Sequence, residues 1–142
     1  MAAVGAFLVA GCASSDPAPT PAACLDERAI TTALARAPDR VRLPDGSPLS
    51  RCVRLAAHRD GDLQALGATL TRIADGLRGA AGSDPQATGR LGYLVGAARR
   101  GAARTPGLAA QLARRLGLTA SFDDALTRDA VLRGVASGEE TG

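Results

Sequence analysis

Apolar side chains recur at alternating steps of three and four residues over 60–80, which is the spacing of one face of an α-helix. Asp60 and Asp62 suit the start of such a helix, and Gly79 and Gly82 suit its end. The apolar positions are Leu63, Leu66, Leu70, Ile73, Leu77 and Ala80. A leucine stripe of this kind indicates a helix face buried in a core, in preference to a cofactor groove.

Helix start and stop signals divide the rest of the chain into further helices. Asp26, Asp84 and Ser121 are the expected N-caps, and Pro38 and Gly117 are expected to end two of the helices. The expected ranges are 26–37, 49–57, 85–104, 105–117 and 121–138. The sequence therefore predicts an all-α protein, an antiparallel helical bundle of about four main helices plus one or two short helices.

The segment 85–104 has one face made of glycine, with Gly89, Gly92 and Gly96 on the same side. Spacing of this kind lets a second helix approach closely, as in membrane helix dimers. The segment also carries four arginines, which makes a place in lipid costly. We therefore expect close packing of this face inside the bundle.

Charge is uneven along the chain, although the net charge is only +3. No acidic residue occurs between Asp84 and Asp123, whereas six arginines do. These arginines, with Tyr93 expected beside them, make up a predicted arginine-rich face: Arg90, Tyr93, Arg99, Arg100, Arg104, Arg114 and Arg115. Arginine matches phosphate and carboxylate groups well, so the face is a candidate for binding anionic lipid or a wall polymer. The alternative is that these arginines are the solvated faces of two helices.

The N-terminus carries an apolar run over 6–11 that ends at Cys12 and is followed by a Ser/Pro-rich stretch. The run is far shorter than the roughly 20 residues of a membrane-spanning helix. Val9-Ala10-Gly11-Cys12 resembles the lipobox of bacterial lipoproteins, in which a signal peptidase cuts before a cysteine that carries diacylglycerol. Two or more acyl chains hold such a protein stably on a membrane.

This resemblance implies a lipoprotein signal peptide over 1–11 and a lipid anchor at Cys12, with a leash over 12–23. A helical domain over 24–138 and a disordered tail over 139–142 then follow. Because such signals usually begin with Lys or Arg and the first positive charge is Arg28, we expect the signal to start upstream of Met1. The implied location is the extracytoplasmic side of the cell membrane. The alternative is a cytosolic helical protein with a chance apolar N-terminus.

If the protein is exported, its two further cysteines are expected to form a disulfide, because thiols in an oxidising compartment are usually paired. We predict a disulfide between Cys24 and Cys52, which would close a loop of about 29 residues and contribute roughly 3 to 4 kcal/mol. A redox pair is the alternative, but the spacing is not Cys-x-x-Cys.

Signatures of catalysis are missing from the sequence. His58 is the only histidine, and neither a nucleophile elbow nor a glycine-rich phosphate loop is present, so we expect no metal, no cofactor and no enzyme activity. Few aromatic residues and the implied compartment argue against nucleic acid. The segment 89–101 is similar to segments of uncharacterised bacterial envelope proteins, to which no activity is attached. The sequence therefore favours a non-enzymatic binding or structural module, with a small lipid-anchored enzyme or metabolite carrier as the alternative.

Overall fold

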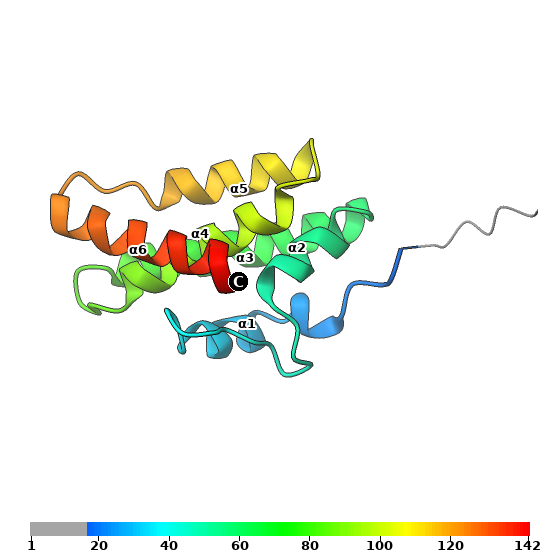
Figure 1. The fold of residues 1–142 in the computed structure, drawn as a ribbon, viewed down its shortest axis with the longest axis horizontal. Helices are drawn as coiled ribbons and strands as arrows, with labels where there is room; N and C mark the ends of the chain where they lie inside the picture. The colour runs from blue at the N-terminus through cyan, green and yellow to red at the C-terminus, as the bar shows by residue number, and fades with distance from the viewer. Residues whose placement is uncertain (1–16) are drawn as a thin grey trace, which may run out of the picture.

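The computed structural model describes residues 17–142, which contain six α-helices and no strand (Figure 1). The elements are a short 3-10 helix η1 (Ala22–Cys24), α1 (Glu27–Leu34), α2 (Leu49–Ala56), α3 (Asp60–Ala80), α4 (Ala87–Ala102), α5 (Leu108–Thr119) and α6 (Ala125–Thr141). The predicted all-α helical bundle is confirmed. The expected signal peptide and the lipid anchor at Cys12 lie outside the described residues.

The centre of the bundle is α4, which packs against α2, α3, α5 and, most extensively, α6. Every residue over 91–98 is buried, so α4 has no exposed side along these two turns. The large core residues of its neighbours include Ile30, Leu66, Leu70 and Leu116. The fold is therefore built around a helix that is enclosed by the others.

Glycines allow α4 and α6 to approach at backbone distance. A Cβ added at any of four glycines would lie closer than 3.0 Å to a carbonyl oxygen of the opposite helix, a separation that real Cβ atoms do not adopt. The glycines are Gly92 and Gly96 on α4, and Gly134 and Gly138 on α6. The predicted close packing of the glycine face inside the bundle is confirmed for Gly92 and Gly96, whose partner is α6, whereas a Cβ at Gly89 would meet nothing within 4 Å.

The C-terminal end of α6 is fixed to the domain, so the expected disordered tail over 139–142 is wrong. Residues 139–141 form the last turn of α6, and Gly142 is buried. The last four carbonyl groups of a helix have no partner within it. Here Arg100 Nη1 donates to the backbone oxygens of Glu139 (2.8 Å) and Glu140. Arg42 Nη1 donates to the backbone oxygen of Thr141 at 3.0 Å. Ser50 Oγ donates to the backbone oxygen of Gly142 at 2.6 Å. These donors come from α4, α2 and the loop before α2, so the tail's own sequence does not reveal them.

Several predicted helix ends shift by a few residues. α5 continues through Gly117 to Thr119, and α6 begins after Asp124 instead of Ser121. The Asp124 carboxylate accepts a hydrogen bond from the Thr127 N–H at 2.8 Å, which caps α6. By contrast, α3 has the bounds that its leucine stripe predicts.

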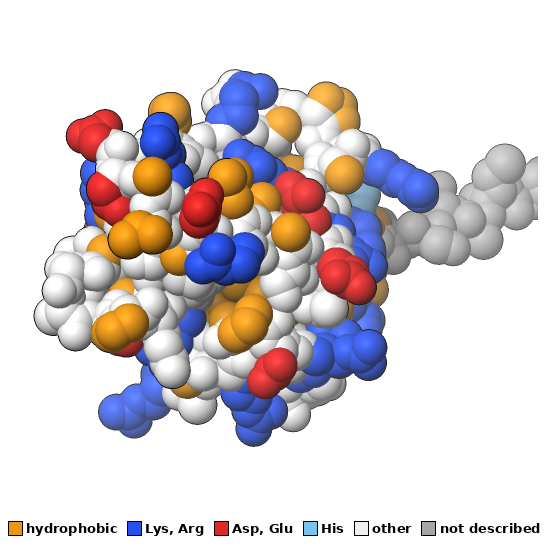
Figure 2. Space-filling model, turned by 60° about the vertical axis from the view of Figure 1, so that its left-hand side comes forward, with side chains coloured by type: hydrophobic (Ala, Val, Ile, Leu, Met, Phe, Trp, Pro, Cys, Tyr) orange, Lys and Arg blue, Asp and Glu red, His pale blue; other side chains and the backbone are white. Residues whose placement is uncertain are grey.

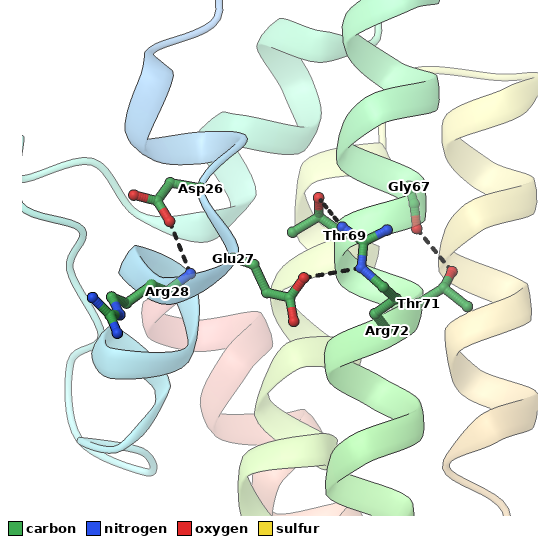
Figure 3. Close-up of polar contacts among 7 residues, drawn as sticks. All are labelled: Asp26, Glu27, Arg28, Gly67, Thr69, Thr71 and Arg72. Atoms are coloured by element: carbon green, nitrogen blue, oxygen red, sulfur yellow. Dashed lines mark hydrogen bonds and ion pairs between the residues drawn. The ribbon is translucent and has the colours of Figure 1, made fainter.

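Two of the points that join the N-terminal part of the fold to the bundle are a cysteine pair and an ion pair. The sulfur atoms of Cys24 and Cys52 are buried 2.04 Å apart, at disulfide distance as predicted, and connect η1 to α2. Because η1 already packs on the domain, the described part of the expected leash is exposed over 17–19 and at Ala22, and its other residues are partly buried. Figure 3 shows the second point, where Glu27 of α1 forms an ion pair with Arg72 of α3 at 2.9 Å. Both side chains of the pair are half exposed, so it contributes little stability.

Candidate functional site

Tyr93 does not belong to the predicted arginine-rich face. Its side chain is completely buried, and its hydroxyl accepts a hydrogen bond from the Val41 N–H at 3.3 Å and lies 2.9 Å from Thr141 Oγ1. The helical spacing of 85–104 predicts an outward Tyr93 only if one side of α4 faces water. Since α6 and the loop before α2 cover that side, Tyr93 is part of the core.

Two of the predicted arginines hold local structure. Arg90 forms an ion pair with Asp84 at 3.1 Å and donates to Gln86 Oε1 at 2.6 Å, and its side chain is mostly buried. Arg100 donates hydrogen bonds to carbonyl groups at the end of α6. The guanidinium groups of both arginines therefore already have partners within the fold.

The remaining predicted arginines lie in different places. Arg99 of α4 and Arg114 of α5 line the same hollow of about 700 Å³. Arg115 instead lines a hollow between α3 and α5 together with Arg72, and Arg104 is exposed in the connection to α5. The structure thus brings Arg99 and Arg114 together and separates them from the others.

A second hollow, of about 360 Å³, adjoins the first and brings in Arg128 of α6. The two hollows share Arg99 and Gly117 and together form a surface channel that we call the α5–α6 groove. Sequence reasoning missed Arg128, because it follows an acidic stretch and lines the same hollow as Arg99 only through the packing of α6 on α4. Nothing in its local sequence signals this position.

The lining of the α5–α6 groove is apolar and basic. Apolar residues supply most of its surface, among them Val95, Ala103, Ala113, Phe122 and Val135. Of the residues that the structure describes, no aspartate or glutamate lines either hollow. Arg99 lies 3.7 Å from Glu139 Oε1, but both side chains are about half exposed, so this pair is weak. The groove therefore offers positive charge beside apolar surface.

The connection between α5 and α6 is held in place by Arg78 of α3. Its guanidinium donates to the backbone oxygens of Thr119 and Ser121, the latter at 2.7 Å, and lies over the Phe122 ring at 4.7 Å. Such a cation–π contact adds about 0.5 to 1 kcal/mol at an exposed site. Arg78 thereby fixes Phe122 at one end of the α5–α6 groove.

Charge is mixed on the face of the domain that Figure 2 shows. Figure 2 shows one face of the domain, where hydrophobic side chains lie among basic and acidic ones without forming a broad apolar patch. A separate group of arginines surrounds the end of α6, namely Arg40, Arg42, Arg54 and Arg100. Two of these already donate to α6 carbonyl groups. The α5–α6 groove is therefore the better candidate for a partner.

Residues 17–142 show neither a candidate metal site nor a membrane-spanning helix. This part of the chain holds no group of three or more His, Cys, Asp or Glu side chains placed for a metal ion, and His58 is exposed beside the end of α2. No helix described by the structure is long and apolar enough to cross a membrane. No family model, curated protein or solved structure matches the chain. Its function is therefore inferred from its own residues.

Proposed function

We propose that this protein is a lipid-anchored protein of the bacterial cell envelope, held by Cys12 on the extracytoplasmic side of the membrane. The lipobox-like sequence over 9–12 supports the anchor, and the Ser/Pro-rich stretch after it supports a spacer. The pairing of Cys24 with Cys52 at disulfide distance is consistent with an oxidising compartment.

The helical domain acts as a non-enzymatic binding module for an anionic partner. The observation that carries this proposal is the α5–α6 groove, where Arg99, Arg114 and Arg128 line a surface without carboxylates among the described residues. Guanidinium groups bind phosphate and carboxylate oxygens through two parallel hydrogen bonds. Anionic lipid headgroups and phosphate-rich wall polymers are the partners that the proposed location provides.

Binding to anionic surfaces tests this proposal. The full chain with Cys12→Ser, which cannot be acylated at residue 12, is titrated with phosphatidylglycerol vesicles and with poly(glycerol phosphate). We expect binding that weakens as salt rises, because exposed charges are screened beyond about 10 Å at 0.1 M ionic strength.

A matched pair of variants locates the surface. Arg114→Gln removes a groove arginine, whereas Arg115→Gln removes its exposed neighbour, which lies outside the groove. Weaker binding of the first variant alone supports the groove as the site. If neither probe shows salt-dependent binding, the proposal is contradicted.

A further inference from the structure

The α5–α6 groove has α5 as one wall along both hollows, and α6 forms the opposite wall in the hollow that contains Arg128. The two helices run in opposite directions along the same side of the bundle (Figure 1), and each packs on α4, yet among the described helices they scarcely touch each other. The floor is α4 from Val95 to Ala102, a length of about 11 Å at 1.5 Å per residue. Two turns of an added α-helix have this length.

The walls carry exposed leucines beside arginines. Leu118 of α5 lines the first hollow and is 74% exposed, and Leu132 of α6 lines the second and is 63% exposed. Arg114 stands on the α5 wall, Arg128 on the α6 wall and Arg99 on the floor. An occupant would therefore meet apolar surface along its middle and positive charge on both flanks.

We propose that the α5–α6 groove binds an acidic amphipathic α-helix of a partner protein. Arg114 and Arg128 line separate hollows that share only Arg99 and Gly117, so the basic charge is divided between the two walls. One phosphate headgroup would occupy one hollow, whereas a helix with carboxylates on both flanks pairs with both walls. Its apolar face lies on the alanine-rich floor and the leucines, which is the usual mode of helix-in-groove recognition.

The chain's own N-terminal residues do not have the chemistry of this occupant. Residues 1–16 contain a single acidic residue, Asp16, so they cannot supply carboxylates to both walls. The binding chemistry depends only on the groove. The identity of the partner as an envelope protein rests on the proposed function.

The test uses the full chain with Cys12→Ser and a fluorescein-labelled synthetic peptide, with leucines on one helical face and glutamates on both flanks. Two control peptides have the same composition in scrambled order, or lysine in place of each glutamate. In fluorescence anisotropy we expect the acidic peptide to bind at least about tenfold more tightly than either control. Equal affinity for the acidic and scrambled peptides overturns the proposal.

Variants on the two walls locate the peptide. Leu118→Ala with Leu132→Ala removes exposed side chains and leaves the core intact, and we expect about a tenfold or greater loss of affinity. Leu126→Ala is the matched control, because Leu126 is 84% exposed on α6 and does not line the groove. For charge, Arg128→Gln is compared with Arg133→Gln on the same helix.

The outcomes separate this proposal from the proposed function. Loss of peptide binding in the groove variants and not in Leu126→Ala or Arg133→Gln supports the helix groove. Binding that all variants retain contradicts it. Phosphatidylglycerol vesicles that bind through the groove, together with an acidic peptide that binds no more tightly than its scrambled control, overturn the helix proposal and leave the anionic binding module standing.

Discussion

The Tyr93 hydroxyl lies 2.9 Å from Thr141 Oγ1, so a buried side chain of α4 is joined to the last turn of α6. The same hydroxyl accepts the Val41 N–H at 3.3 Å, which brings in the loop before α2. Three segments far apart in the sequence therefore meet at one phenol. This contact helps to order the residues that local sequence predicts to fray.

Removing this hydroxyl tests its contribution. Tyr93→Phe keeps the ring in the core and leaves the buried Val41 N–H without its acceptor, so we expect the free energy of unfolding to fall by about 1 to 2 kcal/mol. Urea denaturation measures the change. Thr32→Val, at an exposed position of α1, is the control and is expected to change it by less than about 0.5 kcal/mol. A Tyr93→Phe protein as stable as the wild type would show that these contacts add nothing.

The close approach of α4 and α6 predicts a strong response to a single methyl group. In Gly138→Ala the new Cβ meets the backbone oxygen of Tyr93, and neither helix has a flexible side chain at that point to move aside. We expect a loss of about 3 kcal/mol or more, since overpacking in a rigid core is costly.

The control for this change is Gly76→Ala on α3, where an added Cβ meets nothing within 4 Å. There alanine should stabilise the helix by about 0.5 to 1 kcal/mol, because glycine is the poorer helix former. Thermal unfolding of the two variants should therefore shift in opposite directions. Equal shifts would contradict the role assigned to the glycine contact.

Local patterns predict the helices better than they predict which faces are covered. The stripe from Leu63 to Leu77 is enough to place α3, because periodicity and capping are properties of neighbouring residues. The predictions for Tyr93 and the end of α6 are wrong because the partners of these residues are 39 or more positions away in the sequence. Arg128 joins the α5–α6 groove through the same long-range packing, so neither periodicity nor charge runs reveal it.

Loss of the cysteine pair should weaken the domain without changing its helices. Because Cys24 and Cys52 are 28 positions apart, Cys24→Ala with Cys52→Ala frees a large loop in the unfolded chain, and we expect a loss of about 3 to 4 kcal/mol. Cys12→Ala is the control and should leave unfolding unchanged. Reduction of the wild-type protein should lower its unfolding midpoint, whereas the double variant should not respond to reductant. A wild-type midpoint that is insensitive to reductant contradicts the pairing.

Acid should weaken the start of α6. The hydroxyl and N–H of Thr127 lower the pKa of the Asp124 carboxyl below its ordinary value of 3.8. A group with a lowered pKa in the folded state stabilises the protein above its unfolded pKa, and this contribution is lost as the pH falls through the folded pKa. Asp124→Asn retains a capping oxygen without the charge, so its stability should fall less than that of the wild type below about pH 4. Identical acid unfolding profiles would contradict this role for Asp124.

Mass spectrometry of membrane fractions from the native host tests the central proposal most directly. We predict a mature chain that begins at a diacylated Cys12, fractionates with the membrane and has Cys24 joined to Cys52. A chain recovered in the soluble fraction, with residues before Cys12 still attached and all three thiols free, would contradict it.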